Sequence, residues 1–139
     1  MATDFHIYVT TVGLSHIDVK LPHELNNGNW QIGLSEISYF KVKTVFPTID
    51  VYCDIIAPNI KNGMSRQILR RVYSEKGEVT IRFNPIFYSS VLRTTFDRMT
   101  LYLKSDSEDI SSFKDTTVNC SLHVRQIDND KLRSEYSGL

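Results

Sequence analysis

The sequence predicts an all-β protein, an eight-stranded antiparallel β-sandwich built around one core. Eight short runs of alternating apolar and polar residues extend over nearly the whole 139-residue chain, and a period of two is typical of strands whose two faces differ in polarity. Pro, Gly, Asn and Asp separate the runs, as turn residues do between strands. No longer stretch has the 3.6-residue period of a helix, although residues 89–96 fit a short one.

The first four runs each have one apolar face, which we expect to point into the core. The second run ends at Pro22, because proline has no N–H to donate to a neighbouring strand. In the fourth run, Asp50 alternates outward. The inward residues of the four runs are Phe5, Ile7 and Val9; Ile17, Val19 and Leu21; Trp30, Ile32 and Leu34; and Ile49, Val51, Cys53 and Ile55.

The third run changes phase along its length. Keeping the register of Leu34 would bury Glu36, whereas Ile37 and Tyr39 are apolar in the opposite register. A β-bulge places one extra residue in a strand and so moves the following side chains to the other face. We therefore expect a bulge or bend near Ser35 and Glu36.

The fifth run, residues 66–73, is the weakest of the eight. Ile68 and Val72 share a face with Arg70, and Leu69 shares the opposite face with Arg71, so both faces are mixed. Such a strand suits a sheet edge or a subunit contact. The inward residues of the last three runs are Val79, Ile81 and Phe83; Met99, Leu101 and Leu103; and Val118, Cys120, Leu122 and Val124.

Composition indicates a single globular unit without a strong charge bias. The chain is 41% hydrophobic and 11% aromatic, which suffices for a packed core. We expect one domain over residues 1–127 and a polar, flexible tail over residues 128–139, where the alternation fades. Sixteen basic residues balance sixteen acidic ones, which argues against a dedicated nucleic-acid or polybasic membrane surface. A local patch of Arg66, Arg70 and Arg71 remains an alternative.

Targeting and redox features are few. The N-terminus lacks the basic and apolar regions of a secretory signal, and no apolar run is long enough to span a bilayer. Cys53 and Cys120 are both predicted inward on different strands. Two buried thiols in a reducing compartment are the favoured interpretation, with a disulfide as the alternative.

The motifs of catalysis are missing, so we predict a protein that is not an enzyme and needs no cofactor or metal. The four histidines show no HxH or HExxH spacing. There is no GxSxG elbow and no phosphate loop. Acidic residues at 106–109 do not match an EF-hand loop, so a solvated turn is favoured over a calcium site.

Aromatic residues in or beside the connections suggest another use. In one interpretation, residues 84–93 fold back and cap an open end of the sandwich. In a second they form a contact surface, because aromatic side chains are enriched where proteins meet. Carbohydrate binding by stacked rings is a third. The aromatic residues concerned are Phe40, Phe46, Phe87, Tyr88 and Phe96.

Several blocks of sequence resemble a known family. Residues 29–37 (NWQIGLSEI), 51–58 (VYCDIIAP) and 67–72 (QILRRV) are similar to its W-x-V-G-L-x-E-I, Y-C-D-I-I-x-P and L-L-R-x-V blocks. Asn84-Pro85 and residues 96–103 and 122–125 resemble N-P-x-Y, F-D-x-I-x-I-x-I and L-H-F-R. In this order and spacing, the chain from about Phe5 to Gln126 resembles the penton, or minor capsid, proteins of Polinton/Maverick elements and adintoviruses.

The resemblance implies a single jelly roll, whose eight strands match the eight runs. It further implies a structural viral protein, made inside the host cell and located in the virion, that forms capsid vertices as a homopentamer beside a double jelly-roll major capsid protein. No cofactor and no specific nucleic acid are implied. The short connection at residues 10–15 and the end at Leu139 depart from family members, so a domesticated relative is one alternative. A lectin-like or peptide-binding sandwich is another.

Cyclic assembly requires two different surfaces that fit each other. The mixed fifth run and the apolar connection after Asn84 are the candidates, which would pair arginines with carboxylates and bury aromatic rings. The expected interface residues are Arg66, Arg70, Arg71, Ile86, Phe87, Tyr88, Leu92 and Phe96.

Overall fold

The computed structural model describes residues 4–12, 16–25, 29–41, 48–61, 63–73, 77–92, 95–104 and 117–127. Phe46, the acidic residues at 106–109 and the predicted tail at 128–139 lie outside these residues, as do the side chains of His23 and Phe40. Within the described residues the chain forms eleven strands and no helix. The strands are β1 (Asp4–Val12), β2 (His16–Leu25), β3 (Asn29–Lys41), β4 (Ile49–Cys53), β5 (Asn59–Lys61), β6 (Met64–Arg66), β7 (Ile68–Val72), β8 (Gly77–Arg82), β9 (Tyr88–Ser90), β10 (Phe96–Lys104) and β11 (Thr117–Ile127).

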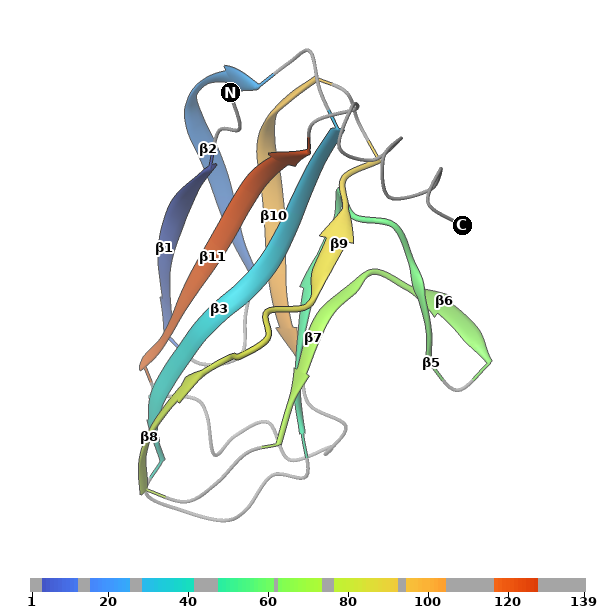
Figure 1. The fold of residues 1–139 in the computed structure, drawn as a ribbon. Coiled ribbons are helices and arrows are strands. Elements are labelled where there is room, and N and C mark those ends of the chain that lie inside the picture. The colour runs from blue at the N-terminus through green and yellow to red at the C-terminus, as the bar shows by residue number, and fades with distance from the viewer. Residues whose placement is uncertain are drawn as a thin grey trace.

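Two antiparallel sheets pack face to face (Figure 1). One has the order β1-β11-β3-β8, with β9 also paired to β3, and the other has the order β2-β10-β4-β7. The first strand pairs with the last, and most connections cross from one sheet to the other, which is the arrangement of a jelly roll. The predicted all-β sandwich and jelly roll are confirmed, and the eight runs correspond to the eight strands in these two orders.

Three short strands were not predicted. β5 and β6 pair only with each other, and β9 lies along β3. The short helix expected at residues 89–96 is wrong, because Ser89 and Ser90 belong to β9 and Val91 forms a bridge with Ile56. The fifth predicted run, residues 66–73, is longer than the strand it corresponds to. In the sheet β7 begins at Ile68, and Arg66 belongs to β6.

The core lies between the sheets and is made of residues that the alternation placed inward. Six of those residues are only partly buried and pack against it, namely Phe5, Ile7, Ile17, Val19, Ile81 and Phe83. The other predicted core residues are buried, namely Trp30, Ile32, Leu34, Val51, Cys53, Ile55, Val79, Leu101, Leu103, Cys120, Leu122 and Val124.

The expected bulge in β3 is present at Ser35. Glu36 pairs with Ser121 and Leu34 pairs with Leu122, so Ser35 is the extra residue. Its hydroxyl donates to the carbonyl oxygen of Ser121 (2.9 Å). Beyond the bulge, Ile37 is fully buried and Glu36 faces outward, as the change of phase predicts.

Two strand predictions need correction. β2 does not end at Pro22 but continues to Leu25, which is possible because β2 is an edge strand and its outer N–H groups need no partner within the sheet. β7 is an edge strand as expected, but a register shift opposite Val51 makes Leu69 an extra residue. Leu69 and Val72 therefore both point inward, although they were predicted on opposite faces.

Asp50 lies on the outward face, as the alternation predicts, in register with Lys104 and Arg71 of the neighbouring strands. Its burial was not predicted: the side chain is fully buried and bonded to Arg71. The Arg71 guanidinium donates from Nε to Oδ1 (2.8 Å) and from Nη2 to Oδ2 (3.1 Å). This two-point pairing compensates the loss of hydration that a buried carboxylate would otherwise suffer.

Removing the arginine tests this ion pair. We expect Arg71→Met to lower the free energy of unfolding by about 3 kcal/mol, because it removes the two-point contact of a cation with a buried carboxylate. Urea denaturation followed by tryptophan fluorescence measures the change. Arg82→Met is the matched control: Arg82 is 84% exposed and 3.9 Å from Glu36, so its loss should cost less than about 0.5 kcal/mol. Equal losses in the two variants would contradict this account.

The two cysteines give a second prediction. Both are free and buried, as expected, and burial raises the pKa of each thiol from 9.0 to about 12. We expect neither thiol to react with a disulfide reagent at pH 8 until the protein unfolds. Unfolded thiols ionise near pH 9 while native ones stay protonated, so the free energy of unfolding should fall as the pH rises from 9 towards 12. Fast labelling of the native protein would show the burial to be wrong.

Candidate interaction surfaces

Arg70 of β7 lies between two aromatic rings from the opposite sheet's edge. Its guanidinium carbon is 4.2 Å from the centroid of Phe83 and 3.7 Å from that of Phe87, and Nη1 donates to the carbonyl oxygen of Pro85 (3.4 Å). Burial lowers the pKa of Arg70 from its ordinary value. The stacked cation therefore ties the connection at residues 84–87 to β7. We call Arg70, Phe83 and Phe87 the arginine clamp.

The clamp changes the prediction of two separate interface surfaces. The structure brings Arg70 and Phe87 into direct contact, so the mixed strand and the apolar connection form one surface rather than two facing sides. Arg71 is engaged by the buried Asp50. Arg66 is exposed and lies on β6, which is a strand of neither large sheet.

The apolar candidates differ in how far they reach solvent. Phe87 is 57% exposed and Leu92 is 61% exposed, so both are available for contact. Ile86 and Tyr88 are half-buried. Phe96 is buried within β10, edge-on to Trp30 with 6.3 Å between ring centroids, and so belongs to the core. Phe96 thus needs correction from a surface aromatic to a packing residue.

Gly33 of β3 permits the close approach of the clamp connection. A side chain there would overlap Ile86 Cγ2 and would lie 2.9 Å from the carbonyl oxygen of Phe87. The absence of a Cβ therefore lets residues 86–88 lie directly on the strand. This requirement was not predicted, because nothing in the local sequence shows which segment covers Gly33.

A polar network covers the outer face of the five-stranded sheet. His123 Nδ1 is 2.6 Å from the Tyr88 hydroxyl, and His123 Nε2 is 3.1 Å from the Asp4 carboxylate. Arg125 lies 3.5 Å from the centroid of the Tyr88 ring and donates to Gln31. The network joins β1, β9, β11 and β3. Its members bond one another rather than facing a cleft, so it serves to hold Tyr88 and β9 in place.

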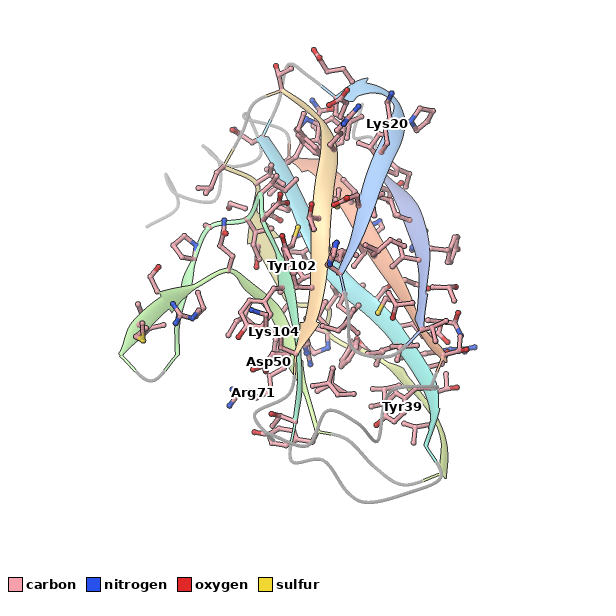
Figure 2. The ribbon with its side chains drawn as sticks, turned by 180° about the vertical axis from the view of Figure 1, so that it is seen from behind. Lys20, Tyr39, Asp50, Arg71, Tyr102 and Lys104 are labelled. Carbon is pink, nitrogen blue, oxygen red and sulfur yellow. The ribbon has the colours of Figure 1, made fainter. Side chains whose placement is uncertain are left out.

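A row of rings crosses the other sheet. Tyr102 of β10 pairs in register with Tyr52 of β4 and with His16 of β2, and the His16 and Tyr102 ring centroids are 5.8 Å apart. Lys104 Nζ lies 5.4 Å and 5.9 Å from the centroids of Tyr52 and Tyr102. Figure 2 shows Tyr102 and Lys104 together on this face. The row escaped prediction because each ring is a single outward residue and only the strand register aligns them.

A groove lies between this row and the β5–β6 hairpin. Its volume is about 490 Å³, within the usual range for binding sites. Tyr52 and Tyr102 line one wall, and Ser65 and Arg66 of the hairpin line another. Leu92 also contributes. We call this the tyrosine groove.

The described residues contain no group of three or more His, Cys, Asp or Glu side chains placed to hold a metal ion. Among the same residues, no helix has the length and apolar character required to cross a membrane.

Comparison with solved structures shows the fold. The mavirus penton protein superposes with a TM-score of 0.69, covering 90% of this chain and 100% of that chain at 7% identity. The Drosophila NLP core has a TM-score of 0.43 at 10% identity, covering 92% of this chain and 100% of that one. A TM-score below 0.5 does not establish that the two proteins share a fold. No protein-family model and no curated protein sequence matches the chain.

Gly33 offers a test of the clamp connection. We expect Gly33→Ala to lower the free energy of unfolding by about 1–3 kcal/mol, since the new methyl group must displace Ile86 and the Phe87 carbonyl. Denaturation of Gly33→Ala, Ile86→Ala and the double variant forms a double-mutant cycle, in which the second substitution should recover part of the first one's cost. Strictly additive effects would contradict the proposed overlap.

Proposed function

We propose that this chain is a structural capsid protein of the penton type, which forms capsid vertices by cyclic self-association. The observation that carries the proposal is the likeness of fold to the mavirus penton protein, which extends over the whole of that chain with a TM-score of 0.69. The sequence blocks that resemble penton proteins of Polinton/Maverick elements and adintoviruses support it independently. Assembly with a double jelly-roll major capsid protein in a virion belongs to the same proposal.

The surface properties agree with assembly by contact. Phe87 and Leu92 are exposed apolar side chains beside the arginine clamp, and Tyr73 at the end of β7 is 73% exposed. Aromatic side chains and arginine are the residue types enriched in protein interfaces. The formal net charge of zero avoids repulsion between like-charged copies around a ring. Such a role requires complementary surfaces and no catalytic group.

A binding module is the second candidate, and the tyrosine groove is the observation that favours it. Tyr52 and Tyr102 present rings side by side, as a site for sugars or an extended peptide would require.

A domesticated relative of a capsid protein is the other alternative. Such a protein would self-associate but would no longer build a capsid particle.

The mass in solution separates these candidates. Light scattering across a concentration series should give five times the chain mass of 16.0 kDa. Phe87→Ser should shift the distribution towards single chains, because it removes an exposed apolar contact at the clamp. Tyr8→Ser is the control: Tyr8 is 76% exposed on β1 and lies outside the clamp, so the mass should not change. A single chain at every concentration would contradict the proposal, and binding on glycan or peptide arrays would then favour the module.

A further inference from the structure

The β5–β6 hairpin belongs to neither sheet. Each strand has three residues, and the turn between them contains Gly63 at a φ of 75°. Figure 1 shows the hairpin standing away from the sandwich. Ile60 is 74% exposed and Met64 is 54% exposed, and the other two described side chains, Ser65 and Arg66, are exposed as well. An isolated two-stranded hairpin is only marginally stable in water, so contact with a partner surface would stabilise the tip of this arm.

The base of the arm is held firmly. The side-chain amide of Gln67 donates to the carbonyl oxygens of Asp54 (2.8 Å) and Ile56 (2.9 Å). The N–H of Cys53 donates to the carbonyl oxygen of Gln67 (3.0 Å). Both ends of the arm are therefore attached to the four-stranded sheet, while the tip extends from it. A rigid base with an exposed apolar tip suits contact with another molecule, because less conformational entropy is lost on binding.

The tyrosine groove has the matching character. Tyr102 is 39% exposed and Leu92 is 61% exposed, and with Tyr52 they give the groove its aromatic and apolar part, while Asp54, Gln67 and Lys104 give it polar edges. Methionine sulfur packs favourably against aromatic rings, which suits Met64 to the two tyrosine rings. The groove's own arm contributes Ser65 and Arg66 to the wall but leaves Ile60 and Met64 in solvent. The groove's own arm therefore does not place its apolar side chains in the groove.

We propose that the β5–β6 arm of one copy docks in the tyrosine groove of the next copy, with Ile60 and Met64 against Tyr52, Tyr102 and Leu92. The proposal rests on the proposed function, since it names the contact by which copies associate. Arm and groove are different surfaces, so the contact is heterologous, and such contacts close into a ring when the rotation between neighbouring copies permits it.

Crosslinking between two single variants tests the contact. Met64→Cys and Tyr102→Cys proteins are mixed and treated with a short bismaleimide. The native thiols do not interfere, because burial holds the pKa of Cys53 and Cys120 near 12. We expect a two-chain product in the mixture that neither variant forms alone. Val12→Cys mixed with Tyr102→Cys is the control, because Val12 is 65% exposed on β1 and lies outside the arm.

The double variant separates this inference from the proposed function. In Met64→Cys/Tyr102→Cys, we expect a ladder of products up to five chains. A product that stops at two chains would support the arm contact and overturn the ring. A product within one chain would overturn the inference, because the arm would then fold onto its own groove. Five-chain particles that give no crosslink would overturn the inference and leave the proposed function standing.

Affinity provides the second readout. Ile60→Ser and Met64→Ser should each weaken self-association by about tenfold or more, the loss expected when a buried aliphatic contact is removed. Val12→Ser, which changes an equally exposed aliphatic residue, should leave the dissociation constant unchanged. Unchanged affinity in both arm variants would overturn the docking. A wild-type protein that stays a single chain at every concentration would overturn both the docking and the proposed function.

Discussion

The bulge at Ser35 determines which side chains of the central strand β3 point into the core. β3 pairs with β11 along one side and with β8 and β9 along the other, so its register fixes those of three neighbours. Without the extra residue, Ile37 and Tyr39 would turn to solvent and Glu36 would enter the core. Ser35 also bonds both neighbours, since its carbonyl oxygen accepts the N–H of Phe83 (3.0 Å) and its hydroxyl donates to Ser121.

The arginine clamp also depends on β3. Two residues before the bulge, Gly33 leaves room for the connection at residues 86–88 to lie on β3. The connection then brings Phe87 over Arg70, which belongs to the other sheet. The arginine clamp thus joins the edges of the two sheets where they carry exposed apolar side chains. On the other sheet, the register of three strands aligns the rings of His16, Tyr102 and Tyr52 beside the arm.

The sequence allowed most of the fold to be predicted, because the polarity of a strand's two faces is a local property. Local alternation does not show what covers an outward residue, which is why the burial of Asp50 was not predicted. Its partner Arg71 lies 21 residues away and meets it only through strand pairing. The β5–β6 arm was missed for a related reason: Ile60 and Met64 face no core, so no alternation marks the hairpin. The two candidate interface segments were recognised, but their contact through Arg70 depends on packing between sheets.

The jelly roll carries the arginine clamp, the tyrosine groove and the projecting β5–β6 arm, and assembly by surface complementarity requires features of this kind. Electron cryo-microscopy of the purified chain tests the central claim most directly. The account predicts closed five-fold rings in which each sandwich contacts two neighbours through different surfaces. A population of isolated sandwiches at high protein concentration would contradict it.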